Sequence, residues 1–164
     1  MDSIRRLAPA AYCTGAALIL LPAVDYLNNA SPFRPTAADW RFDVLGMIST
    51  HLLYPLLGFL LVSATAAAFP HPRVSRILGL LIWVGAIVLL MAAGGFVLDS
   101  LQVRNAAPAG TRWVSQTGFV IAAAKILAGA VTLMVLGVGN RRAAGAYVAP
   151  PSTRSAPAAI IGQR

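Results

Sequence analysis

Long apolar stretches separated by short polar segments dominate the chain. They cover residues 7–27, 44–69, 74–101 and 117–139. Each stretch has about 20 residues or more, the length that an α-helix needs to cross the hydrocarbon core of a membrane. The pattern therefore predicts an all-α fold, an integral membrane four-helix bundle formed by residues 1–142.

The second stretch has a marked boundary at each end. A charged and aromatic collar, Asp39–Trp40–Arg41–Phe42–Asp43, precedes it, and Pro70 follows it. Aromatic side chains are enriched where a span meets the head groups. Trp40 and Phe42, and likewise Trp113 before the fourth span, are therefore expected to be interfacial anchors.

The first stretch follows Arg5 and Arg6, so a cleaved signal peptide is an alternative to a membrane span. The apolar run is longer than a typical signal core, and no small-x-small cleavage site follows it. An uncleaved first span is the prediction.

Composition agrees with a lipid environment. Of 164 residues, 58% are hydrophobic and 11% are charged, whereas about 25% charged residues is usual in soluble domains. The net charge of +8 would suggest nucleic acid in a soluble protein. Here the basic residues, Lys125 excepted, flank the apolar runs or lie in the tail, so the lipid bilayer is the expected partner and nucleic acid is not.

The distribution of arginine predicts the orientation. Four spans place both termini on one side, together with Arg5, Arg6, Arg73, Arg76, Arg141, Arg142, Arg154 and Arg164. The other side has Arg34, Arg41, Arg104 and Arg112. Because basic residues favour the cytoplasmic side, both termini are expected in the cytoplasm. The Ala-, Pro- and Ser-rich segment 143–164 is predicted to be a disordered tail. High Ala, Arg and Pro with a single Lys suggests a GC-rich bacterium, hence the inner membrane.

Ionisable residues in the spans fall at one level in the outer half. Asp25 and Asp99 lie near the outer ends of their spans, and His51 and Lys125 lie roughly 12 Å below the outer mouths of theirs. Charged groups inside membranes are costly and tend to mark sites or pathways. These four residues form the candidate polar cluster. The alternative is an ion pair of Lys125 with Asp99 or Asp25, with the lysine reaching toward the outer surface.

Two prolines predict helix bends. Pro22 lies inside the first span, and Pro55 removes the N–H that would bond to the carbonyl of His51. A histidine at a bend can be a proton relay or a ligand; the alternative is a core residue with one hydrogen bond. Haem with two axial histidines is not expected, because His71 lies at the opposite end of the same span.

Small residues recur along the fourth span at Gly118, Ala122, Gly129, Ala130 and Gly137. Small residues allow close approach of helices. They predict packing within the bundle, with self-association or contact with other membrane proteins as the alternative.

Enzyme signatures are missing from the sequence. It has no paired-carboxylate site, phosphate-binding glycine loop or metal-ligand cluster. The single cysteine, Cys13, excludes an internal disulfide and a thiolate metal cage. No catalytic residue, metal or cofactor is predicted.

The block Asp39–Trp40–Arg41–Phe42, followed by Tyr54–Pro55–Leu56–Leu57–Gly58, resembles a pattern in small, mostly uncharacterised bacterial four-span proteins. Some of these are similar to proteins grouped with hormogonium polysaccharide biosynthesis. The resemblance covers about thirty residues and implies an accessory role near an envelope or polysaccharide machine. It assigns no site residue.

The leading prediction for function is a non-enzymatic accessory or assembly subunit of a membrane complex. The alternative is a small transporter or channel that uses Asp25, His51, Asp99 and Lys125. A third hypothesis is an intramembrane enzyme acting on lipid or quinone, which would need a convergent pocket.

Overall fold

The computed structural model describes residues 7–69, 71–106 and 112–146. Within these residues the chain forms five helices and no strand, so the predicted all-α class is confirmed. The helices are α2 (Ala8–Asn29), α3 (Ala38–His51), α4 (Leu53–Ala68), α5 (Pro72–Ala106) and α6 (Arg112–Ala146).

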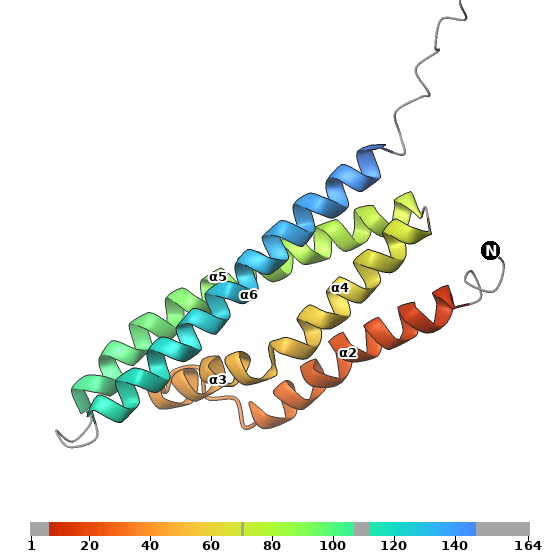
Figure 1. Ribbon diagram of the computed structural model, residues 1–164. Coiled ribbons are helices and arrows are strands. Elements are labelled where there is room, and N and C mark those ends of the chain that lie inside the picture. Colours follow the sequence, from red (N-terminus) through yellow and green to blue (C-terminus); the bar gives the residue numbers. More distant parts are fainter. Residues whose placement is uncertain (1–6, 70, 107–111, 147–164) are drawn as a thin grey trace, which may run out of the picture.

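Helix α2, the pair α3 and α4, helix α5 and helix α6 run in alternately opposite directions (Figure 1). The start of α2, the end of α4, the start of α5 and the end of α6 lie at one end of the molecule. The other end holds the connection from α2 to α3, the end of α5 and the start of α6. Both ends of the described chain therefore lie at the same end of the molecule.

Three segments are long and apolar enough to cross a membrane: Ala8–Asn29, Pro72–Gln102 and Gln116–Gly145. The pair α3 and α4 passes the same test only when taken together, and its two halves are bent by 46°. The chain therefore has three candidate spans, or four if the bent pair is one broken span. The exposure of large apolar side chains along these helices agrees with a lipid environment.

Helices α5 and α6 extend beyond the predicted spans at 74–101 and 117–139. The sequence between Leu101 and Ala106 contains no Gly or Pro, so nothing there terminates a helix. At its other end α6 continues through Arg141 and Arg142 to Ala146, into the first residues of the predicted tail. The rest of that tail, 147–164, lies outside the described residues.

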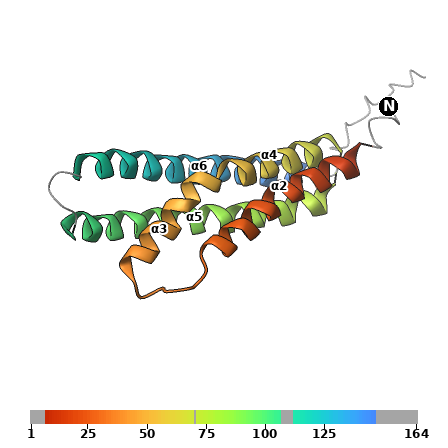
Figure 2. The same ribbon diagram turned by 90° about the horizontal axis from the view of Figure 1, so that it is seen from below.

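The main core lies between α5 and α6, which run side by side along their length (Figures 1 and 2). Ile82, Ala86 and Phe96 on α5 meet Ile126 and Ala130 on α6, and all five are buried. A Cβ atom at Gly137 would lie 2.9 Å from Trp83 Nε1, so this glycine lets the two helices approach closely. Other side chains of the same chain thus pack against the small residues Gly129, Ala130 and Gly137.

Helix α2 lies at the periphery. It packs mainly on α4 and, less extensively, on α3. The closest approach joins Gly15 and Gly58, where a Cβ atom on Gly58 would lie 2.7 Å from the carbonyl oxygen of Gly15. Only 6% of the apolar window of α2 is buried, compared with 33% for α5 and 28% for α6. Few residues of α2 are therefore fully buried within the chain.

The break between α3 and α4 falls at Leu52, three residues before Pro55. Helix α3 consequently inclines to the long axis of the α5–α6 pair, as Figure 2 shows. Near the break, Ser49 Oγ and Thr50 Oγ1 each donate a 2.8 Å hydrogen bond to a backbone carbonyl one turn back. Pro22 differs from Pro55, because α2 continues through it as one helix.

Candidate functional site

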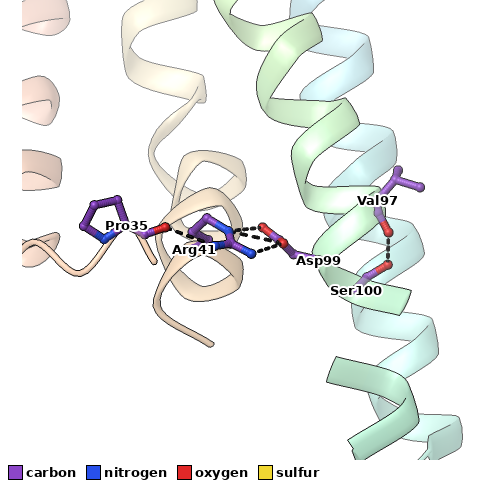
Figure 3. A network of polar contacts seen from close by, with 5 residues as sticks. All are labelled: Pro35, Arg41, Val97, Asp99 and Ser100. Carbon is purple, nitrogen blue, oxygen red and sulfur yellow. Dashed lines mark hydrogen bonds and ion pairs between the residues drawn. The ribbon is translucent and has the colours of Figure 1, made fainter. Parts of the chain in front are cut away.

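The first polar site joins the start of α3 to the C-terminal part of α5 (Figure 3). The guanidinium of Arg41 donates to both carboxylate oxygens of Asp99, from Nη2 to Oδ1 at 2.9 Å and from Nε to Oδ2 at 3.1 Å. Its Nη1 donates to the carbonyl of Pro35 at 3.0 Å. Asp99 is only 6% exposed. One arginine therefore fastens the α2–α3 connection and α3 to α5.

The partner of Asp99 is therefore Arg41 and not Lys125. Arg41 was predicted to belong to the interfacial collar and not to the candidate cluster. A planar guanidinium binds a carboxylate with two parallel hydrogen bonds, which a lysine cannot do. Arg41 directly precedes a span on the same predicted side as Asp99, but so does Arg112, and Arg104 follows Asp99 on that side, so the sequence did not single out the partner.

The second polar site joins α2 to the end of α3. His51 Nε2 lies 3.1 Å from Asp25 Oδ2, and this contact links two helices that are otherwise loosely packed. The side chain of His51 is 29% exposed and that of Asp25 is 62% exposed. The structure therefore brings together two of the four residues of the candidate polar cluster.

His51 is held by contacts at both ring nitrogens. Its Nδ1 lies 3.0 Å from the carbonyl oxygen of Met47 and 3.0 Å from Thr50 Oγ1. The Thr50 hydroxyl donates to the same carbonyl. These contacts orient the ring so that Nε2 faces Asp25.

The two sites are separate. Arg41 and His51 are ten residues apart on α3, which corresponds to about 15 Å along the helix. Lys125 is exposed on α6, and among the described residues it forms no ion pair with Asp25 or Asp99. Of the four residues in the candidate cluster, Asp25 and His51 thus contact each other, Asp99 is paired with Arg41, and Lys125 is paired with neither aspartate.

A partly open cavity of about 430 Å³ lies beside His51. All five helices contribute to its wall, which is almost entirely apolar: Ile19, Ala23 and Tyr26 from α2, Ile48 from α3, Phe59 from α4, Val88 from α5 and Leu133 from α6. Both prolines that predicted bends, Pro22 and Pro55, also line it. Sequence reasoning missed this cavity, because its wall consists of ordinary apolar residues from five separate segments.

The aromatic residues assigned to the interface have different surroundings. Trp40 Nε1 donates a 3.0 Å hydrogen bond to the carbonyl of Ala30, which ties the start of α3 to the end of α2. Phe42 instead faces the core, where its ring stacks on Phe96 at 4.9 Å between centroids. The side chain of Trp113 lies outside what the structure describes.

The described ranges contain no candidate metal-binding site. No group of three or more His, Cys, Asp or Glu side chains there could hold a metal ion. Cys13 is an exposed free thiol on α2.

Comparisons of this chain with protein-family models, with curated proteins and with solved structures found no match. The site therefore has to be interpreted from its own geometry.

Proposed function

We propose that this protein is a non-enzymatic accessory subunit of a membrane complex, which uses its apolar lateral surface to hold a hydrophobic component. In this proposal α3 and α4 cross the membrane as one broken span. The protein then has four spans with both termini in the cytoplasm, as the arginine distribution favours. Its location is the bacterial inner membrane.

The observation that carries the proposal is the way in which the polar groups are used. Arg41 and Asp99 satisfy each other, and Lys125 is remote from both pairs. The cavity that adjoins the remaining pair, His51 and Asp25, has an apolar wall. This arrangement favours binding of an apolar component over passage of a polar solute, since a polar solute needs a polar route.

The test is purification from native membranes in mild detergent, followed by mass spectrometry with stoichiometry. We expect a membrane protein to co-purify in a fixed ratio. The resemblance described above makes envelope polysaccharide machinery the first place to look for this partner. Recovery of the chain alone, as a monomer or homo-oligomer, in native membranes that express the whole complex would overturn the accessory role.

A small proton-coupled transporter is the second candidate. The specific observation that favours it is the contact between His51 and Asp25 beside the broken span. Broken helices mark binding sites in several transporter folds.

Proton flux into liposomes tests this second candidate. The transporter hypothesis expects flux that is abolished by His51→Gln and unchanged in Lys125→Met, the control for loss of a charge elsewhere in the same half. Equal flux in protein-free liposomes would exclude it.

A further inference from the structure

We propose that the arginine-rich end of the α5–α6 pair binds one anionic phospholipid. Arg141 and Arg76 bind its phosphate, and its acyl chains lie along exposed apolar side chains of α5 and α6. This inference goes beyond the accessory role and depends neither on that role nor on the cavity beside His51.

The end of the molecule that holds the start of α5 and the end of α6 is positively charged (Figure 1). Arg73, Arg76, Arg141 and Arg142 lie there, and all four are exposed. The aspartates in the described part of the chain lie toward the opposite end, near the end of α2, on α3 and near the end of α5. None of the four arginines forms an ion pair with a described residue. Their counter-charge can therefore come from an anionic ligand.

Arg141 is positioned by an aromatic ring. Its Cζ lies 5.3 Å from the centre of the Trp83 ring, which is a cation–π contact. Trp83 is itself fixed, because its Nε1 is buried at the point where a Cβ atom on Gly137 would lie 2.9 Å away. Within the described residues the guanidinium of Arg141 donates no hydrogen bond. Its N–H groups are therefore available for phosphate oxygens, which a guanidinium binds with two parallel hydrogen bonds.

Arg76 lies at the same level as Arg141. The candidate spans are Pro72–Gln102 and Gln116–Gly145. Arg76 follows the start of the first by four residues and Arg141 precedes the end of the second by four, about 6 Å in each case. Gly79 is one turn after Arg76, and a Cβ atom on it would lie 3.7 Å from Cγ of Arg141. The two arginines therefore border the same part of the α5–α6 contact, near the membrane boundary where phospholipid phosphates lie.

An exposed apolar stripe continues from these arginines toward the middle of the spans. On α5, Leu80 and Ile87 follow Arg76 by four and eleven residues, the spacing of one helix face, and they are 61% and 52% exposed. On α6, Val138 precedes Arg141 by three residues and is 39% exposed. Two cations at one end of an apolar stripe match a phosphate that carries acyl chains. A soluble phosphate would leave the stripe uncovered.

Charge selects among phospholipids. Phosphatidylethanolamine and phosphatidylcholine carry a cation beside the phosphate, which would add a positive charge to a patch without a carboxylate among its described residues. Phosphatidylglycerol carries the phosphate without that cation. Basic pockets between membrane helices bind anionic head groups for this reason.

The experiment uses the full chain in nanodiscs of phosphatidylcholine. The probe is a phosphatidylglycerol with a photoreactive diazirine in the upper part of one acyl chain. After irradiation, labelled peptides are mapped by mass spectrometry. We expect labelling concentrated around Leu80 on α5 and Val138 on α6. The stretch around Leu98, an exposed apolar residue near the other end of α5, is the internal control. Equal labelling around Leu80 and Leu98 would overturn the proposal.

Competition on the unsubstituted protein tests the head group and requires no variant. Unlabelled phosphatidylglycerol should displace the probe. Phosphatidylethanolamine with the same acyl chains should displace it about tenfold less well, as expected for the loss of one favourable charged contact. Equal displacement by the two lipids would contradict selection by charge. Displacement by glycerol phosphate in solution would show a site for a soluble anion instead of a lipid.

A matched pair of variants tests the position. Arg141→Gln should reduce local labelling about tenfold. Arg142→Gln removes the same charge at the same end, but its position is about 100° around α6, so it should reduce labelling by about twofold at most. Arg141→Lys should restore only part of the labelling, because a lysine lacks the guanidinium fork. Thermal unfolding checks that each variant is folded. Equal effects of Arg141→Gln and Arg142→Gln would show diffuse attraction and overturn the site.

The outcome is separable from that of the accessory role. Localised labelling of a chain that purifies without any partner would retain the lipid site and overturn the accessory role. A stoichiometric protein partner without localised labelling would do the reverse. Labelling that disappears when the partner is bound would show that the partner, and not a lipid, covers the arginines in the complex.

Discussion

The two aspartates near one end of the molecule belong to pairs of opposite character. Asp99 is buried, and both of its carboxylate oxygens accept hydrogen bonds from Arg41. The same guanidinium also donates a hydrogen bond to the carbonyl of Pro35. Asp25 is largely exposed and has a single 3.1 Å contact with His51, and His51 lines an apolar cavity. Similar chemistry has thus been placed in two different environments.

Burial decides what each pair can do. A buried carboxylate without a partner is strongly unfavourable, so Asp99 and Arg41 are held together and have no free capacity for a ligand. An exposed pair contributes little to stability, and its unused oxygen is available. We therefore interpret the Arg41–Asp99 pair as a structural contact that holds α3 to α5, and the His51–Asp25 pair as part of a binding site. The following predictions test this division, from the largest expected effect to the smallest.

Removal of the arginine should cause the largest loss. Arg41→Met leaves the buried Asp99 carboxylate without a cation, so the midpoint of thermal unfolding in detergent should fall by on the order of 10 °C. The double variant Arg41→Met with Asp99→Leu should recover most of this loss, because no buried charge remains. Thermal unfolding followed by intrinsic fluorescence measures both. Losses that simply add in the double variant would show that the two side chains are not coupled.

Conservation of charge without the guanidinium geometry should have an intermediate effect. Arg41→Lys keeps a cation near Asp99 but loses the two parallel hydrogen bonds and the contact with Pro35. We expect about half the decrease in unfolding midpoint that Arg41→Met causes. A lysine variant as stable as the original protein would mean that charge alone, and not the fork geometry, holds α3 to α5.

The exposed pair should be much less sensitive. Asp25→Asn and His51→Gln should each lower the unfolding midpoint by less than about 3 °C, because exposed ion pairs contribute about 1 kcal/mol at most. Their main effect should be on binding at the cavity. The same thermal assay, run beside Arg41→Met, measures the difference. A decrease as large as that of Arg41→Met would reverse the roles that we assign to the two pairs.

The sequence was sufficient for the helical class and for three of the candidate spans, because long apolar runs constrain a chain strongly. It also predicted a cluster of Asp25, His51, Asp99 and Lys125, since ionisable groups beside lipid need partners. It could not choose the partners. That choice depends on the angle of α3 to α4 at the break at Leu52, which accompanies the contacts of Arg41 with Asp99 and of His51 with Asp25.

The cavity and the inward position of Phe42 were beyond sequence reasoning for a related reason. Phe42 directly follows the charged Arg41 and reads as part of the collar, but the inclined helix turns its ring onto Phe96. On α2 the cavity begins at Ile19, four residues after Gly15, which packs closely on Gly58, and its wall comes from all five helices. Both features depend on helix crossing geometry, which side-chain periodicity alone does not encode.

The smallest effect should come from Lys125. Its side chain is exposed on α6 and, in the described part of the chain, is paired with neither aspartate. A long lysine stem can carry its ammonium group toward the membrane surface, so Lys125→Met removes no interhelical contact. We expect an unfolding midpoint within about 1 °C of the original and additivity with Asp99→Asn or Asp25→Asn to within about 0.5 kcal/mol. A coupling well above that value would mean that Lys125 reaches an aspartate in the membrane. Lys125 would then have to be added to the Arg41–Asp99 pair or to the His51–Asp25 pair, and the roles of the two pairs would have to be reconsidered.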